Sequence, residues 1–350
     1  MTLLSETGTE LFTLTKDLVN IPSITGDEGA CAAFMHGFLA RRGWKTERLP
    51  VSGGRFNVFA FRGRPEIVLS THLDTVPPFA NAREDEEFIY GRGSCDAKGI
   101  AAAQVMAAER LAAEGLESVG LLFLVGEEIL SDGAQAANER PPGSKYLING
   151  EPTCNKLALG TKGVLRFDLH VKGKMAHSAY PQLGVSAVEK LLDILADVRK
   201  LPLPVDETLG PSTLNIGMIS GGCAVNVIPG EAQAQLLFRT VPQPADTPRL
   251  KAQMESLLKG RCEFEVVRET PWIKMEKLDG FEADVVAFST DVPSLTRWGQ
   301  PFLLGPGTIH VAHTDHECVR KHELLEAVDL YSRLVKLLAA RGKVESKIQS

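Results

Sequence analysis

Histidine and acidic residues in this sequence follow several short apolar stretches, where a buried strand would end. His72 and Asp74 lie at and just beyond the end of the apolar run 66–73. Residues two apart on a strand face the same way, so Asp74 can accept a hydrogen bond from one ring nitrogen of His72 and leave the other for a metal ion. A structural histidine satisfied by a neighbouring acid is the alternative, and this motif alone does not decide between the two.

Asp96 lies in the glycine-containing segment 91–99, where a loop leads into an alanine-rich helix expected over 97–114. An aspartate at that place commonly caps the helix, because its side chain accepts hydrogen bonds from the first backbone N–H groups. Its two carboxylate oxygens can instead bridge two cations. Taken alone, the segment favours the capping role.

Glu127 and Glu128 follow the apolar run 119–125 and Gly126. Two adjacent carboxylates at the end of a buried strand are costly unless something positive lies between them. Consecutive side chains diverge, so one acid can bind a metal ion while the other holds a water molecule at that metal. A solvated acidic turn is the alternative interpretation.

Two later motifs add further candidate ligands. Glu151 follows the apolar run 146–149, and His310, His313 and His316 follow a glycine-rich turn. All of these motifs lie at or just after an apolar strand, which is the edge where open α/β sheets bind ligands. Two histidines and several carboxylates that converge there are the ligand set expected for a pair of zinc-like ions.

The elements that must position these residues alternate between helix and strand in the first part of the chain. Leucines recur at helical spacing over 9–20, and a second helix is expected over 27–42. The apolar strands between such helices are nearly continuous, which is typical of strands buried on both faces. The sequence therefore predicts an α/β fold with a mixed sheet and helices on both of its faces.

A different pattern covers residues 161–270. The expected strands are 164–171, 213–219, 232–240 and 262–268, and the expected helices are 185–199 and 247–258. This β-α-β-β-α-β order predicts an inserted α+β domain of antiparallel strands with two helices on one side. The catalytic domain then comprises residues 1–160 and 271–350, and it ends in a helix expected over 323–341.

Length and composition exclude several classes of partner. The chain has 350 residues, more than one hydrophobic core usually organises. A net charge of −6 without any basic run argues against nucleic acid or an anionic membrane as the main partner. No signal peptide and no apolar stretch of ~18 residues is recognisable. The six cysteines form no C-x-x-C pair, so free thiols in the cytoplasm are expected.

Taken together and in this order, the motifs resemble those of the M20 metallopeptidases. They are HLDTVP at 72–77, GRGSCDAKG at 91–99, GEE at 126–128, GEPT at 150–153, AHSAYP at 176–181, GPG at 305–307 and AHT at 312–314. The resemblance covers essentially the whole chain. The family includes acetylornithine and acetyl-lysine deacetylases, succinyl-diaminopimelate desuccinylase and the glutamate carboxypeptidases.

The resemblance implies which residues bind metal. It implies two zinc ions, for which Co²⁺ or Mn²⁺ can substitute, each with its own histidine and glutamate and with one aspartate shared between them. The ligands are His72 and Glu151 for the first ion, Glu128 and His313 for the second, and Asp96 as the bridge. His316 stands where an acid is usual in the family, so His310 and His316 stay open as alternatives to His313.

The resemblance also implies which residues act on the substrate. Glu127 would be the general base that takes a proton from the attacking water, and Asp74 would orient the neighbouring histidine. His177 would polarise the scissile carbonyl, often from the second subunit of a homodimer formed through the inserted lid and dimerisation domain. Asn226 and Arg239 match positions that contact the substrate's carboxylate.

The expected function is hydrolysis of the amide bond in a small N-acyl amino acid or short peptide in the cytoplasm. A deacetylase of amino-acid biosynthesis acting on acetylornithine or acetyl-lysine is the first expectation. A succinyl-diaminopimelate desuccinylase and a family dipeptidase or carboxypeptidase are the alternatives, because Arg239 and Asn226 could hold an α-carboxylate in each. A non-catalytic ligand-binding homologue would be expected to lack Glu127 or His313, and both are present.

Overall fold

The computed structural model of the protein describes residues 3–242 and 247–348. The chain divides into two compact units. The first comprises residues 1–158, 275–284 and 290–350, and the second comprises residues 159–274 and 285–289. The short segment 285–289 therefore groups with the second unit, although the sequence placed it in the catalytic domain.

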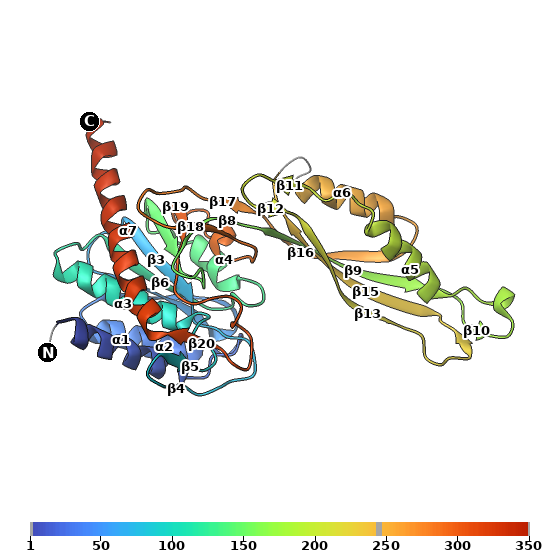
Figure 1. The fold of residues 1–350 in the computed structure, drawn as a ribbon, viewed down its shortest axis with the longest axis horizontal. Coiled ribbons are helices and arrows are strands. Elements are labelled where there is room, and N and C mark those ends of the chain that lie inside the picture. The colour runs from blue at the N-terminus through green and yellow to red at the C-terminus, as the bar shows by residue number, and fades with distance from the viewer. Residues whose placement is uncertain (1–2, 243–246, 349–350) are drawn as a thin grey trace. The chain divides into compact units, whose positions relative to one another are not determined.

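The first unit is built on a six-stranded mixed sheet (Figure 1). In spatial order the strands are β1 (Lys45–Pro50), β2 (Phe56–Phe61), β6 (Val119–Leu124), β3 (Ile67–His72), β7 (Tyr146–Asn149) and β19 (Gln300–Leu303). β6, β3, β7 and β19 run parallel to one another, whereas β1 and β2 pair antiparallel at one edge. The predicted mixed sheet is confirmed.

Helices cover both faces of this sheet, which explains why its central strands are apolar throughout. One face packs against α1 (Leu3–Val19), α2 (Gly29–Arg41), α3 (Lys98–Ala113) and α7 (Lys321–Ile348). Leu121 and Phe123 of β6 point to that side, and Leu122 and Leu124 point to the other, where α4 (Asp132–Asn138) lies. Burial of each such side chain stabilises the fold by about 1.5–3 kcal/mol.

The β1–β2 hairpin is an element that the sequence pattern did not predict. In β1 only Leu49 is buried, and Lys45, Glu47 and Arg48 are charged. An edge strand needs no continuous apolar run, because only one side of it pairs with the sheet. This explains why β1 was missed; β2, which is apolar, largely buried and paired on both sides, was missed without such a reason.

Short strands complete the first unit and the segments next to it. β4 (Arg83–Glu84), β5 (Phe88–Tyr90) and β20 (Cys318–Arg320) form one three-stranded sheet. A second such sheet contains β17 (Ile273–Lys274), β8 (Leu157–Thr161) and β18 (Ala283–Val286). The single-turn helices are η1 (Ser52–Gly54) and η3 (Val292–Ser294). No helix in the described part of the chain is long and apolar enough to cross a lipid bilayer.

The second unit is a four-stranded antiparallel sheet with two helices on one face. Its strands, in spatial order, are β13 (Thr213–Gly221), β15 (Glu231–Thr240), β9 (Gly163–Lys172) and β16 (Glu263–Thr270). Alternate residues of β9 and β15 are buried beneath α5 (Ala187–Val198) and α6 (Thr247–Leu258). The predicted β-α-β-β-α-β order is confirmed. Smaller elements are β10 (Ala176–His177), η2 (Pro181–Leu183), β11 (Val205–Asp206), β12 (Gly210–Pro211) and β14 (Val227–Ile228).

Candidate metal centre

The carboxyl ends of the parallel strands bring the predicted ligands of the first unit together. β3 ends at His72, and the segments that follow β6 and β7 carry Glu128 and Glu151. Asp96 precedes α3, and His313 lies in the loop between β19 and β20. Because parallel strands present their carboxyl ends at the same edge, residues far apart in the sequence meet there.

His72, Asp96 and Glu151 form the first cluster, in which the nearest ligand atoms of all three lie within 4.8 Å of one another. His72 Nε2 lies 3.0 Å from Asp96 Oδ1 and 3.8 Å from Glu151 Oε2. All three side chains are buried. The other carboxylate oxygen of Glu151, Oε1, has no hydrogen-bond partner among the described residues, which leaves a buried acceptor without a counterpart.

Asp96, Glu128 and His313 form the second cluster, again with ligand atoms within 4.8 Å of one another. His313 Nε2 lies 3.0 Å from Glu128 Oε1 and 3.4 Å from Asp96 Oδ2. Asp96 therefore belongs to both clusters and directs one oxygen at each histidine. This is the arrangement expected of a carboxylate that bridges two cations.

Of the three candidate histidines near the C-terminal end, the structure brings His313 to Asp96 and Glu128. His310 and His316 are exposed, and within the described chain neither joins a cluster of possible ligands. His313 has a φ of 63°, in the left-handed region that residues other than glycine rarely adopt. Such a conformation persists only where the surrounding structure holds it, and it is common at functional sites.

Asp74 has a wider set of contacts than the sequence suggested. The Nδ1 atom of His72 lies 3.0 Å from the backbone oxygen of Asp74 and 3.6 Å from its carboxylate, so the backbone carbonyl accepts the closer hydrogen bond. The Asp74 carboxylate itself accepts hydrogen bonds from the backbone N–H groups of Glu127 and Glu128, both at 3.1 Å, and from the Thr25 hydroxyl at 2.9 Å. Asp74 thus orients both His72 and the glutamate pair.

Glu127 is next to the clusters but a member of neither. Its carboxylate accepts no hydrogen bond within the described chain, in contrast to the carboxylate of Glu128. Burial raises the pKa of Glu127 well above its usual value, and the carboxylates of Asp291 and Glu128 add to the effect. With no hydrogen-bond partner and a raised pKa, Glu127 is a carboxylate available to take up a proton.

The turn just before Glu127 requires glycine. Gly126 has a φ of 79°, and a Cβ there would lie 2.0 Å from Asp132 Oδ1.

The electrostatics of the two clusters show that positive charge is needed between the acids. Hydrogen bonds that His313 donates to the carboxylates of Asp96 and Glu128 raise its pKa to about 10. Burial acts to lower the pKa of His72, but hydrogen bonds to Asp74 and Asp96 outweigh it and raise that pKa well above its usual value. Two histidine nitrogens and three carboxylates, one with a buried free oxygen, match the ligand chemistry of a pair of divalent cations such as zinc.

The raised pKa values predict how the stability of the metal-free protein depends on pH. We expect the free energy of unfolding to fall as pH rises from 6.5 towards 10, because the folded state binds the proton of His313 more tightly than the unfolded state does. The stabilisation is complete below pH 6.5 and is lost at the pKa of the folded state, and His72 acts in the same direction. The change should be modest, because the His313 side chain is 47% exposed.

Urea unfolding of the chelated protein at several pH values measures this dependence. His313→Gln should flatten the slope between pH 6.5 and 10, and His310→Gln, a change at an exposed histidine nearby in the chain, should leave it unchanged. Equal slopes for His313→Gln and the unaltered chain would contradict the assignment of the raised pKa to His313.

The other predicted site residues lie in the second unit. His177 lies on β10, pairs with Val227 of β14, and its Nδ1 accepts a hydrogen bond from the Ala179 N–H at 3.1 Å. The backbone oxygen of Asn226 accepts from the Ser178 N–H, so His177 and Asn226 lie in neighbouring segments. Both side chains are exposed.

Arg239 is placed at the other end of this unit's sheet. It pairs with Val164 at the start of β9, whereas Glu231, at the opposite end of β15, pairs with Lys172. A strand rises by ~3.4 Å per residue, so Arg239 lies roughly 27 Å along β15 from Glu231. Glu231 is at the end of β15 that lies nearer to Asn226. The structure therefore does not bring Arg239 beside His177 and Asn226 within this unit.

Arg268 is a candidate functional residue that the sequence reasoning missed. It pairs across β16 and β9 with Arg166, and Arg239 pairs with Val164, two residues along the same strand, so the three arginines share one sheet face. Burial lowers the pKa of Arg239, and the charge of Arg268 lowers it further. No periodic pattern in the sequence identifies Arg268, because a register shift between Val266 and Arg268 moves it to the face opposite Phe264 and Val266.

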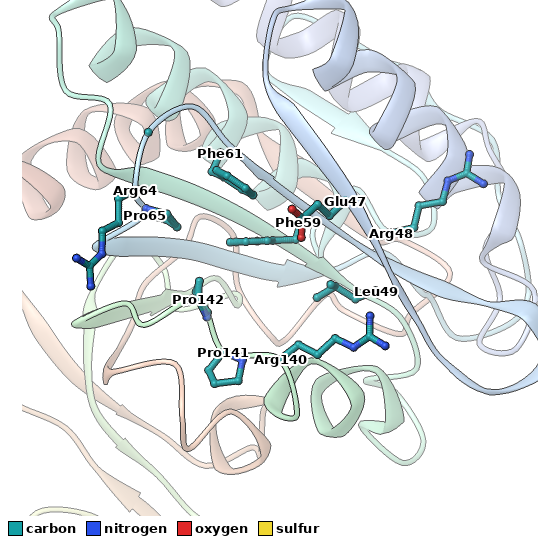
Figure 2. A pocket seen from close by; sticks show the side chains of 11 residues that line it. Glu47, Arg48, Leu49, Phe59, Phe61, Arg64, Pro65, Arg140, Pro141 and Pro142 are labelled. Atoms are coloured by element: carbon teal, nitrogen blue, oxygen red, sulfur yellow. The ribbon is translucent and has the colours of Figure 1, made fainter.

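Among the described residues, neither the buried Cys95 nor the cavity beside β1 and β2 supplies a competing active site. All six cysteines are free, and burial raises the pKa of Cys95 well above its usual value, which disfavours the thiolate needed for a nucleophile. A cavity of about 690 Å³ lies beside β1 and β2, lined in part by Leu49, Phe59 and Phe61 (Figure 2). None of the predicted site residues lines it.

Comparisons with known proteins place the chain among metallopeptidases. Residues 159–264 match a family model described as a peptidase dimerisation domain. A peptidase M20 domain-containing protein of Schizosaccharomyces pombe is 38% identical over 341 residues, which cover 94% of this chain and 84% of the relative. A probable carboxypeptidase of Aspergillus fumigatus is 38% identical over 385 residues, with 95% of this chain and 87% of the relative covered.

A solved structure shows the same fold. A dinuclear metal-binding peptidase of the M20 family from Bacillus subtilis superposes with a TM-score of 0.71 at 16% identity, over 95% of this chain and 98% of that one. That neighbour is described as a dinuclear metal-binding peptidase, and in this chain the two clusters around Asp96 supply candidate metal ligands. Sequence identity, fold and clusters together show that this chain belongs to the M20 family of metal-dependent peptidases and amidohydrolases.

Proposed function

We propose that the protein is a two-metal hydrolase that cleaves the amide bond of a small N-acyl amino acid or short peptide. The observation that carries this proposal is the position of Asp96, whose Oδ1 faces His72 at 3.0 Å and whose Oδ2 faces His313 at 3.4 Å. Two divalent cations held there would polarise the scissile carbonyl and lower the pKa of a water molecule.

The proposed ligands divide as the two clusters do. His72 and Glu151 hold one ion, Glu128 and His313 hold the other, and Asp96 contacts both. We propose zinc as the metal, because imidazole nitrogen and carboxylate oxygen are ligands that it commonly takes in hydrolases. Co²⁺ and Mn²⁺ accept the same donors and would serve as substitutes.

Glu127 is proposed as the general base. Its carboxylate has no partner within the described chain, and burial raises its pKa above the usual value, which favours uptake of a proton. It would take the proton from the attacking water at its carboxylate and deliver the proton to the nitrogen of the leaving amine. Asp74 would hold Glu127 in place through the 3.1 Å hydrogen bond from the Glu127 N–H.

Arg239 and Arg268 support a substrate that carries a free carboxylate. Their shared face of the second unit concentrates positive charge, and within the described chain no acid pairs with the Arg239 guanidinium. A guanidinium binds carboxylates with two parallel hydrogen bonds, which suits the α-carboxylate of an amino acid. Arg239 and Asn226 lie at opposite ends of the same sheet, so Asn226 is proposed to add an amide contact to this substrate from the second subunit of a homodimer.

The leaving amine is accordingly proposed to be an amino acid. Acetylornithine and acetyl-lysine are the first candidate substrates, with N-succinyl-diaminopimelate as an alternative. The fungal relative is named a probable carboxypeptidase, which favours a substrate whose amino acid is linked to a short peptide and not to a simple acyl group. All of these reactions release an amine that carries an α-carboxylate, so the same cationic residues would serve each of them.

His177 is proposed to polarise the scissile carbonyl, and the second unit is proposed to form a homodimer. The Nδ1 of His177 accepts the Ala179 N–H, which leaves a proton on Nε2 to donate to a substrate oxygen. Removal of a hydrogen-bond donor at the developing oxyanion raises the activation barrier by about 3–4 kcal/mol. The match of residues 159–264 to a dimerisation domain supports the homodimer.

Metal content and a substrate panel test the proposed function. The panel contains N-acetylornithine, N-acetyl-lysine, N-succinyl-diaminopimelate, a dipeptide and an N-acylglutamate, each also as its C-terminal amide. About two metal ions per chain, with turnover of one free acid that chelation abolishes, would support the proposal. A purified chain that binds no zinc and stays inactive after zinc is added would overturn it.

Arg239→Ala tests the carboxylate site on the substrate that the panel identifies. We expect KM for the free acid to rise about 10- to 100-fold, because a charge-assisted hydrogen bond contributes about 1.5–3 kcal/mol. KM for the corresponding amide should change little. Arg166→Ala is the matched control, because Arg166 shares the sheet face but is paired with Asp168 at 2.9 Å. Equal effects of Arg239→Ala on acid and amide would remove Arg239 from the substrate site.

A further inference from the structure

A strand pairing places the loop that carries Asp96 beside the loop that carries His313. β5 and β20 pair antiparallel, with Cys318 opposite Tyr90. The pairing continues one step further, because the Gly91 N–H donates to the backbone oxygen of Glu317 at 3.1 Å. The chain then runs from Gly91 towards Asp96 on one side and leads back from Glu317 towards His313 on the other.

The Glu317 side chain lies between these two loops and is saturated with hydrogen bonds. Its Oε1 accepts the backbone N–H groups of Gly93, Cys95 and Asp96 at 2.9, 3.2 and 3.1 Å. Its Oε2 accepts from Arg92 Nη1 at 2.6 Å. Glu317 and Arg92 are only 3% and 4% exposed, so this buried pair has little solvent screening.

The loop conformation supplies this set of donors. Gly93 has a φ of 88°, and a Cβ there would lie 2.9 Å from both Lys98 Cδ and Thr75 Cγ2. Glycine is therefore required at this position, and the turn it permits directs the N–H groups of Gly93, Cys95 and Asp96 towards one point. Such a concave set of backbone N–H groups binds anions, and here the anion is the carboxylate of Glu317.

We propose that Glu317 is a positioning residue of the metal centre that fixes the backbone of Asp96 and ties it to the loop of His313. The inference rests on the proposed metal-binding function and adds a residue to it. Glu317 is not a ligand in either cluster. It acts through two ligands of the second cluster: Asp96, whose N–H it binds, and His313, four residues before it in the chain.

Glu317→Gln tests this role with little change in side-chain volume. The amide keeps one oxygen acceptor, but its NH₂ group must face either Arg92 or the backbone N–H groups, donor against donor. We expect metal affinity to fall about 10- to 100-fold, the range typical for residues that support a metal ligand. Titration of the metal-free protein with Co²⁺ measures the affinity, and the visible absorption of bound Co²⁺ should change because the ligand geometry is loosened.

A buried carboxylate in the second unit provides a matched control. Asp206 accepts the N–H groups of Thr208 and Leu209, both at 2.9 Å, and pairs with Lys274 at 2.8 Å. Asp206→Asn therefore removes a similar set of contacts away from the candidate metal centre. It should lower the melting temperature without altering the Co²⁺ affinity or spectrum.

The outcomes separate this inference from the proposed function. If the unaltered chain binds two Co²⁺ ions and Glu317→Gln binds them with the same affinity and spectrum, Glu317 is only structural and the inference is overturned. If the unaltered chain binds no Co²⁺, the metal centre itself is wrong. Should Glu317→Gln fail to fold, Arg92→Lys keeps the three backbone contacts and loosens only the Oε2 side. A smaller loss of Co²⁺ affinity then supports the inference, and an unchanged affinity overturns it.

Discussion

Glu127→Gln should lower kcat by about 10²- to 10⁴-fold while two metal ions stay bound, since that range is typical of a general acid–base residue. Glu127 lies in neither ligand cluster, and its carboxylate accepts no hydrogen bond within the described chain. Glutamine fills the same space but cannot take up the proton from water. The side chain therefore contributes to proton transfer without contributing to metal binding, and kcat with metal content measured on the same sample tests both parts.

The neighbouring acid is the matched control for this experiment. Glu128 differs from Glu127 by one position, but its Oε1 lies 3.0 Å from His313 Nε2. Glu128→Gln should release one metal ion as well as lower turnover. If instead Glu127→Gln released metal and Glu128→Gln retained it, the roles assigned to the two glutamates would be exchanged.

Asp96→Asn should weaken the binding of both metal ions together. No other single ligand substitution is expected to do this. Asparagine keeps one oxygen but loses the charge and the second acceptor, and Asp96 faces His72 with one oxygen and His313 with the other. We expect an affinity loss above about 100-fold, beyond the range for residues that only support a ligand. Competition with a chelator, followed by metal analysis, measures the loss for each ion.

Two further variants show whether the effect belongs to the bridging position. His313→Gln should weaken mainly the binding of the ion in the second cluster, because His313 belongs to that cluster alone. Asp315→Asn removes an exposed carboxylate from the same loop and should leave both ions in place. Loss of a single ion from Asp96→Asn, with the other bound at its original affinity, would show that Asp96 does not bridge.

The strand ends that carry the candidate ligands could be predicted from the sequence, because each follows an apolar run. His72, Glu128 and Glu151 were assigned to one edge of a parallel sheet, and the structure brings them there. The edge strand β1 escaped prediction because only Leu49 is buried in it, and the apolar, largely buried β2 beside it was missed as well. The metal-binding roles themselves stay predictions until metal content is measured.

Contacts between distant segments could not be predicted in the same way. The choice of His313 over His310 and His316 rested on resemblance, and only the fold of the loop brings His313 to Asp96 and Glu128. The backbone hydrogen bonds to Asp74 depend on where the turn after β6 lies in space. Neither contact leaves a periodic pattern in the sequence.

Apolar periodicity and short motifs are local properties of the chain, so the family, the mixed sheet, the inserted antiparallel unit and the residue types at the sheet edge were predictable from the residues. The hydrogen bonds between Glu317 and the loop of Asp96, and the shared face of Arg268 and Arg239, became visible only in the folded protein. Such contacts across paired strands depend on register, and register is set by the packing of the whole unit.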